Sequence, residues 1–305
     1  MIKRLLDCNT SDFMKMEKLD ILEAIEASEG RILVSEMIGM YDPVLHSISN
    51  AETAAAFGAD ILLLNMLDVY NPIFNGIPNV NNEEIIREIK RLTGRLVGIN
   101  LEPVDKTHET IGEITPISIG RLATVETALK AYEMGCNMVV LTGNPGTGVS
   151  NNAILSSIQQ INSVLGDKLI LVAGKMHAAG SIKEAGENII TKSDIKEFVD
   201  AGCDIILLPA PATVPGITTD YIRELVKYSH SLGALTITAI GTSQEDADSD
   251  TIKQIALMCK MTGTDMHHIG DAGYKVAIPE NIMDYSIAIR GKRHTYARMA
   301  RSINR

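Results

Sequence analysis

The sequence predicts a (β/α)8 barrel with an extra N-terminal helix, because one unit recurs eight times along its 305 residues. Each unit consists of a helical stretch, a glycine, a short apolar run and a polar loop, and successive glycines lie 28 to 41 residues apart. The apolar runs are nearly continuous in Val, Ile and Leu, as in parallel strands buried on both faces. A doubly wound open sheet is the competing fold, but it more often stops short of eight strands. The repeating glycines are Gly30, Gly58, Gly94, Gly135, Gly166, Gly202, Gly233 and Gly263.

Each expected strand follows one of these glycines, which we expect to close a helix in the left-handed conformation. The segment 11–30 precedes the first strand and is expected to form the extra helix, which covers the bottom of the barrel or contributes to a subunit contact. We therefore divide the chain into a helical extension, 1–30, and one barrel domain, 31–305. The expected strands lie within 31–39, 60–66, 95–103, 137–145, 168–177, 204–212, 235–243 and 266–273.

The composition narrows the range of partners. The formal net charge of -10 argues against nucleic acid or an anionic membrane as the main partner. The locally basic segment 290–305 is expected to be a solvated or subunit-facing helix. No stretch resembles a signal peptide or a membrane span. The four cysteines lack metal-ligand spacing, so we expect reduced thiols and a cytoplasmic protein.

The stretch "GNPGTGVS", 143–150, is one residue away from a phosphate-binding P-loop. Val149 stands where that motif requires a lysine, and the loop follows a barrel strand, so ATP binding here is not expected. Ser150 is a plausible N-cap for the next helix. The glycines fit either an anion-binding turn or a tight turn that covers the mouth.

Polar residues end most of the expected strands, where the active sites of barrel enzymes lie. Burying each of them without a partner would cost about 1–3 kcal/mol, so a structural barrel has no reason to collect so many. We therefore expect a site at this end. The residues expected to bind substrate are Glu36, Asn65, Asn100, Asn144 and Asp271.

Lys175, His177 and Glu102 are the candidate catalytic residues. A lysine inside the mouth could form a Schiff base or act as an acid or base. It could also pair with Glu102 or Glu36, or bind an anionic substrate without covalent chemistry. His177 lies two residues further on, so it should face the same side as Lys175. It could transfer protons, bind a metal ion or serve only as a hydrogen-bond partner.

The carboxylates Glu36, Asp68 and Glu102 come from different strand ends and could hold Mg²⁺. They could equally accept hydrogen bonds from substrate hydroxyls or from the lysine. His267 and His268 are adjacent in the last strand, so only one of them can face the barrel interior.

The loops after the last two strands, "IGTSQED" and "IGDAGY", combine glycines with hydroxyl side chains. Such loops often bind phosphate in barrels. In this respect the chain resembles the phosphate-binding (β/α)8 barrel superfamily, which implies aldolase, isomerase or synthase activity on phosphorylated metabolites. Class I aldolases usually carry their Schiff-base lysine on strand six, whereas the lysine here lies on the expected strand five. The expected phosphate-binding residues are Gly241, Thr242, Ser243, Gly270 and Gly273.

Two functions follow from these patterns. The first is an enzyme of lyase/aldolase or isomerase/epimerase type that acts on a small phosphorylated or carboxylated metabolite. The second is a non-catalytic, metabolite-binding barrel that regulates a partner protein through its N-terminal extension and basic C-terminal segment. In both cases we expect a small, anionic ligand and a homo-oligomer.

Overall fold

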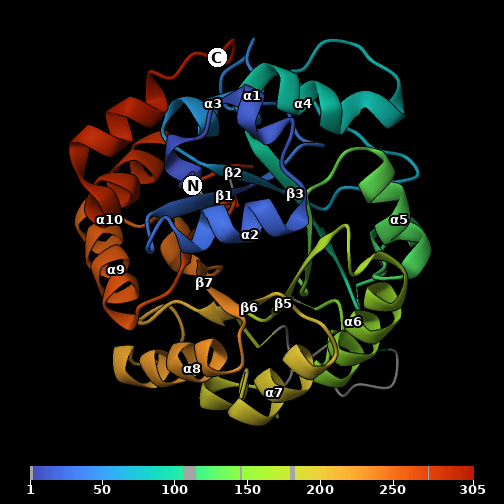
Figure 1. Cartoon of the computed structure of the whole chain (residues 1–305), viewed down its shortest axis with the longest axis vertical. Coiled ribbons are helices and arrows are strands. Elements are labelled where there is room, and N and C mark those ends of the chain that lie inside the picture. Colours follow the sequence, from blue (N-terminus) through green and yellow to red (C-terminus); the bar gives the residue numbers. More distant parts are fainter. Residues whose placement is uncertain (1–2, 106–114, 145, 179–182, 274) are drawn as a thin grey trace.

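The computed structural model describes residues 3–105, 115–144, 146–178, 183–273 and 275–305. Eight parallel strands pair in sequence order and close into a barrel, which confirms the predicted fold class (Figure 1). The closure runs through β1 and β8, with Ser35 paired to Ile269. Each strand lies within the range predicted for it. The strands are β1 (Ile32–Ile38), β2 (Ile61–Asn65), β3 (Leu96–Leu101), β4 (Met138–Leu141), β5 (Ile170–Gly174), β6 (Ile205–Pro209), β7 (Leu235–Ile240) and β8 (Met266–Ile269).

Helices surround the barrel, and short 3-10 turns interrupt several loops (Figure 1). The α-helices are α1 (Thr10–Phe13), α2 (Lys18–Glu26), α3 (Asn50–Ala56), α4 (Ile85–Thr93), α5 (Val125–Glu133), α6 (Asn151–Leu165), α7 (Lys192–Asp200), α8 (Thr219–Ser231), α9 (Ser249–Thr262) and α10 (Pro279–Met299). The 3-10 turns are η1 (Leu5–Asp7), η2 (Asn82–Glu84), η3 (Ile119–Arg121), η4 (Gly186–Asn188) and η5 (Ser243–Asp246). Within the described residues, no helix is both long and apolar enough to cross a membrane.

The helix ends follow the predicted chemistry with one exception. The Ser150 hydroxyl accepts a hydrogen bond from the Ala153 amide at 3.1 Å, so it caps α6 as expected. The repeating glycines have positive φ, which suits a residue without Cβ, except for Gly166. Gly166 ends α6 with φ -60, and a Cβ there would lie 2.6 Å from the Asn162 carbonyl oxygen. Close packing therefore explains that glycine better than a left-handed turn does.

Aliphatic side chains fill the barrel interior and continue into the N-terminal extension. Ile25 of α2 belongs to the same apolar cluster as Ile32, Leu96 and Ile170, which lie at the starts of their strands. Figure 1 shows α2 crossing the end of the barrel. The extension therefore covers the bottom of the barrel, which is one of the two roles predicted for it. The opposite end, where the strands finish, remains available for a site.

The basic C-terminal segment is packed differently from the prediction. Arg290 and Arg298 of α10 are buried and form ion pairs with Asp60, at 2.5 and 2.8 Å. Arg298 also donates to the Leu5 carbonyl oxygen at 2.7 Å. The expectation of a solvated or subunit-facing helix is therefore wrong for these two arginines. They join α10, the start of β2 and the N-terminal extension.

In the described part of the chain, Asp60 is the only acidic residue that pairs with these two buried arginines. Burial by itself would raise its pKa, but Arg290, Arg298 and a hydrogen bond from the Leu33 amide hold the pKa of Asp60 below its ordinary value. Asp60 therefore stays ionised, and the ion-pair network joins elements far apart in the sequence.

The cysteines Cys8, Cys136, Cys203 and Cys259 are buried free thiols, as predicted. Burial raises the pKa of Cys8 to about 11 and that of Cys136 to about 12. These thiols are therefore protonated and unreactive near neutral pH.

We expect Arg298→Met to lower the free energy of unfolding by about 3–5 kcal/mol, because it leaves buried charge on Asp60 less compensated. Urea unfolding would measure the loss. Arg293→Met, at an exposed position on the same helix, is the matched control and should change stability by less than about 0.5 kcal/mol. Equal effects of the two substitutions would contradict a special role for the buried network.

Candidate functional site

A cavity of about 200 Å³ opens at the ends of the strands, where barrel enzymes bind their substrates. Residues from or next to most of the strands line it, and they include eight of the predicted site residues. The lining residues are Glu36, Asn65, Asn100, Thr142, Gly143, Asn144, Met176, His177, Gly241, Thr242, Glu245 and Asp271. The sequence-based list did not include Thr142, Gly143, Met176 or Glu245.

The inward direction of the first polar residues follows from strand alternation. Glu36 comes two residues after the interior Val34, and Asn65 comes two residues after the interior Leu63. In these two strands the last inward position is thus polar, while the earlier ones are aliphatic. The apolar interior therefore supports the site from below.

A network of side-chain amides joins these strand ends. The Asn65 amide nitrogen donates to Asn144 Oδ1 at 3.1 Å and to Asp271 Oδ2 at 3.0 Å. The Asn100 amide nitrogen donates to Asn65 Oδ1 at 3.2 Å and to Glu36 Oε1 at 2.5 Å. All five predicted substrate-binding residues therefore lie in one connected network.

The two adjacent histidines point in opposite directions, as predicted. His268 faces the interior, with Nε2 at 3.2 Å from Glu36 Oε2. His267 faces the helices, and its ring nitrogens lie 3.1 Å from the Gly30 carbonyl oxygen and 3.3 Å from the Tyr285 hydroxyl. Burial lowers the pKa of His267 to about 4, so it is a neutral core residue.

The carboxyl groups of Glu36, Glu245 and Asp271 converge on the cavity. Burial, together with the charges of Glu36 and Asp271, raises the pKa of Glu245 to about 9. Burial and Glu36 also raise the pKa of Asp271, although hydrogen bonds from Asn65 and the Gly273 amide partly oppose this shift. Near neutral pH, Glu245 therefore carries a proton.

His177 lines the same cavity. Burial lowers its pKa, and the nearby Lys175 charge adds to this effect, while Glu36 opposes it. The imidazole is therefore neutral near neutral pH and can accept a proton. The structure thus brings a candidate base, His177, and a candidate acid, Glu245, to one cavity.

The structure places Lys175 differently from the prediction. Its side chain is buried, forms an ion pair with Glu184 and does not line the cavity, whereas Met176 does. Met176 joins Val172 in the interior cluster, so alternation directs Lys175 away from the axis. Burial lowers the pKa of Lys175 to about 8, and the Asp194 charge partly opposes that shift. Lys175 and His177 therefore do not share the mouth.

Glu102 also lies outside the cavity lining. Its carboxylate forms an ion pair with Arg121, and its second oxygen accepts a hydrogen bond from the Asn144 backbone amide at 3.3 Å. Glu102 therefore supports the loop after β4, and its predicted catalytic role stays a prediction.

The three predicted Mg²⁺ ligands are not brought together. Glu36 binds Asn100, and Glu102 pairs with Arg121. Asp68 accepts hydrogen bonds from the Tyr70 and Asn71 amides at 2.8 and 3.1 Å. Burial opposes ionisation of Asp68, but hydrogen bonds from Ser118 and these amides lower its pKa. Among the residues the structure describes, no group of three or more acidic, histidine or cysteine side chains could hold a metal ion.

The predicted phosphate-binding residues are only partly at the cavity. Gly241 and Thr242 line it, and the Thr242 hydroxyl donates to the Thr213 carbonyl oxygen at 3.0 Å. Ser243 and Gly273 are exposed. Gly270 lies against the Glu245 carboxyl group, which a Cβ at that glycine would approach to 2.2 Å.

The loop that resembles a P-loop turns through Gly146 and Gly148, which have φ of 75° and 72°. Besides capping α6, the Ser150 hydroxyl donates to Asp105 Oδ2 at 2.9 Å. Pro145 lies outside the described residues. Anion binding by this loop therefore stays a prediction.

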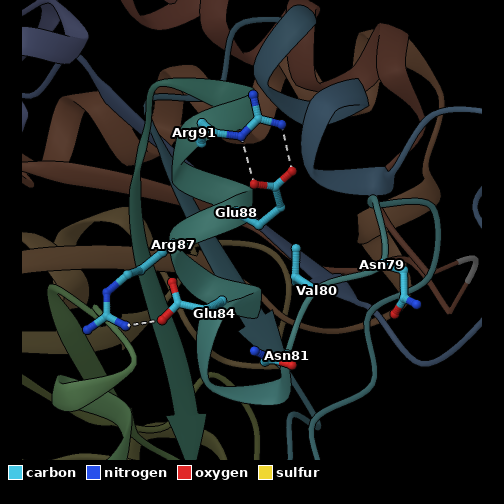
Figure 2. A pocket seen from close by; sticks show the side chains of 7 residues that line it. All are labelled: Asn79, Val80, Asn81, Glu84, Arg87, Glu88 and Arg91. Atoms are coloured by element: carbon cyan, nitrogen blue, oxygen red, sulfur yellow. Dashed lines mark hydrogen bonds and ion pairs between the residues drawn. The ribbon is translucent and has the colours of Figure 1, made fainter.

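A larger cavity of about 500 Å³ lies beside α4, on the outside of the barrel. Figure 2 shows its charged side chains already paired, Arg87 with Glu84 at 2.8 Å and Arg91 with Glu88 at 2.6 Å. These are exposed pairs one helical turn apart, which contribute little energy. Because none of its lining residues comes from a strand end, we assign the functional site to the smaller cavity.

The proton on Glu245 should make stability depend on pH. Its contribution is fully present below the unfolded-state pKa of about 4.5 and is lost as the pH rises towards 9. Glu245→Gln has no ionisable group at this position, so its free energy of unfolding should rise relative to that of the wild type between about pH 4.5 and pH 9. Because Glu245 is only half-buried, solvent screening keeps the slope below about 1.4 kcal/mol per pH unit, the limit for one proton. Urea unfolding at several pH values measures it.

Asp246→Asn removes a carboxylate from the same turn without entering the cavity and is the control. The Asp246 charge is the weakest of the contributions that raise the pKa of Glu245, so the profile of this variant should run nearly parallel to that of the wild type. A Glu245→Gln profile that is also parallel would contradict the raised pKa.

No curated protein matches the chain. Among solved structures, three similar ones share 13% identity with it. Thiamine phosphate pyrophosphorylase from Pyrococcus furiosus has a TM-score of 0.48, over 86% of this chain and 96% of that one. A 2,3-dimethylmalate lyase of the PEP mutase/isocitrate lyase superfamily has a TM-score of 0.49, over 84% and 81%. The Amycolatopsis orientalis BexX/CysO complex has a TM-score of 0.46, over 86% and 89%.

Likeness at this level carries no information about chemistry, and the barrel rests on the closed sheet itself. A family model gives a more specific result. The model described as "Domain of unknown function (DUF7916)" matches residues 6–305, so the chain belongs to this family.

Proposed function

We propose that the protein is an enzyme that moves a proton on a small polar metabolite, in a lyase- or isomerase-type reaction. One observation carries this proposal: a neutral imidazole and a protonated carboxyl group line the same cavity. Two titratable groups whose surroundings shift their pKa values in opposite directions are suited to act as a catalytic base and acid. The cavity volume of about 200 Å³ fits a small ligand.

His177 is the base in this proposal. Its imidazole is neutral near neutral pH because burial disfavours the charged form, so it can take a proton from a substrate carbon or hydroxyl. Glu245 is the acid, because its carboxyl group keeps its proton up to a pKa of about 9. The pair supplies both halves of a proton transfer without a permanent charge on either residue.

The amide network orients the ligand. Asn65, Asn100 and Asn144 hold one another and the carboxylates Glu36 and Asp271 in fixed positions. Preorganised polar groups of this kind lower the barrier because they need not reorganise during the reaction. The network therefore supports catalysis rather than binding alone.

The regulatory alternative loses part of its support. It relied on the basic C-terminal segment as a partner surface, but Arg290 and Arg298 are buried against Asp60. A homo-oligomeric state and a cytoplasmic location remain predictions from the sequence.

Proton abstraction can be tested before the substrate is known. Incubating the protein in D₂O with a pool of small hydroxy and keto compounds should place deuterium in one of them, detected by mass spectrometry. His177→Asn and Glu245→Gln should each slow this exchange by about 10²–10⁴-fold, the usual contribution of general acid–base catalysis. Asp246→Asn, in the same turn as Glu245 but exposed, is the control and should exchange at the wild-type rate. Exchange that survives both cavity substitutions would disprove the proposed roles.

Lys175→Met separates the structural from the catalytic role of that lysine. Since Lys175 pairs with Glu184 outside the cavity, we expect a loss of about 1–3 kcal/mol in the free energy of unfolding. Deuterium exchange by the folded variant should be preserved. Loss of exchange with unchanged stability would restore the catalytic role predicted from the sequence.

A further inference from the structure

The loops after β7 and β8 leave between them the position where many barrels bind a phosphate. We call this space, between Gly241–Thr242 and Gly270–Ala272, the β7/β8 loop site. The Glu245 side chain from η5 enters it. Glu245 Oε2 accepts a hydrogen bond from the Ala272 amide at 2.6 Å, and Oε1 lies against Gly270. A carboxyl group of the chain itself thus takes the amide that would otherwise face an anion.

The backbone at this point is shaped around that contact. Ala272 has φ of 58°, a conformation that residues with a Cβ rarely adopt and that costs about 1 kcal/mol or more. The hydrogen bond to Glu245 helps to hold it. A Cβ at Gly270 would lie 2.2 Å from Glu245 Oε1, so the glycine makes room for the carboxyl group.

The charge of the cavity also disfavours an anion. Its ionisable side chains are Glu36, Glu245, Asp271 and His177, and no lysine or arginine is among its described lining residues. Among the described lining residues, an anionic ligand would therefore meet carboxyl groups and no lysine or arginine to compensate its charge. Sites that bind phosphate usually supply backbone amides, arginine or lysine for that purpose.

Two buried polar atoms at the cavity indicate what the ligand offers instead. In the described structure, Asn100 Oδ1 and Thr142 Oγ1 have no hydrogen-bond partner. Both residues line the cavity and are more than nine-tenths buried. An amide oxygen can only accept, so its partner must be a donor such as a hydroxyl group.

We infer that Glu245 takes the place of a ligand phosphate in the β7/β8 loop site, so that the cavity selects an uncharged, hydroxyl-bearing metabolite over an anionic one. This inference narrows the substrate class of the proposed enzyme. It rests on the proposed function only where it calls the ligand a substrate. It replaces the phosphorylated or carboxylated ligand expected from the sequence. Glu245 is thereby both the proposed acid and a specificity-determining residue.

Inorganic phosphate is the probe that tests the occupied site. We expect Glu245→Ala to bind phosphate at least about tenfold more tightly than the wild type, because it frees the Ala272 amide and removes a carboxyl group. Isothermal titration calorimetry at constant ionic strength, with chloride as the competing anion, measures the difference. Glu245→Gln keeps an acceptor in the site and should gain nothing. Asp246→Ala removes a carboxylate from the same turn but outside the cavity, and it should also gain nothing.

Two results would overturn the inference: wild-type protein that binds phosphate as tightly as Glu245→Ala does, or a gain that Asp246→Ala reproduces. If Glu245→Ala fails to fold, the wild type and Glu245→Gln still decide the matter. Tight phosphate binding by either one would show that the β7/β8 loop site is open to anions. Phosphate binding does not require turnover, so a failure of deuterium exchange would count against the proposed reaction and leave this inference standing.

Discussion

Closure of the eight-stranded sheet is the constraint on which the rest of the structure depends. In a closed parallel barrel, alternate side chains of every strand point at one axis. Ile32, Val34 and Glu36 occupy three successive inward positions of β1, and the first two are apolar while the last is polar. The same order in β2 ends in Asn65. Because the aliphatic layers fix the barrel, the polar ends are held at defined positions without relying on flexible loops.

The carboxyl groups at the two ends of the barrel differ in their partners. Near the strand starts, Asp60 is compensated by Arg290 and Arg298, which lower its pKa and tie three distant segments together. At the strand ends, Glu36, Glu245 and Asp271 face one another without an arginine or lysine among the described cavity residues. Buried carboxyl groups that lack a lysine or arginine partner destabilise a fold. Their concentration at the mouth is therefore better explained by function than by stability.

The sequence predicted the strands, whose ends carry Glu36, Asn65 and Asn100, and it placed the extension under the barrel as one of two alternatives, but it did not predict the hydrogen-bond network among these residues. Apolar runs bounded by glycine mark strands, and period-two alternation carries Asn65, Asn100 and the pair His267–His268 to the correct faces. Lys175 was misplaced because it follows the end of β5, where Met176 and not the lysine continues the inward row. Glu245 was missed because its position depends on a 3-10 turn and on contacts with Gly270 and Ala272, 25 or more residues further along the chain.

Glu245 connects the chemistry of the site with its selectivity. A protonated carboxyl group can accept the Ala272 amide hydrogen through one oxygen and still offer its own proton to a ligand through the other. A phosphate in the same position would take the amide hydrogen but would bring negative charge next to Glu36 and Asp271. Burial raises the pKa of Glu245 most, and the charges of Glu36 and Asp271 raise it further. Those two charges also repel an anion, so the surroundings that keep the acid protonated favour an uncharged substrate.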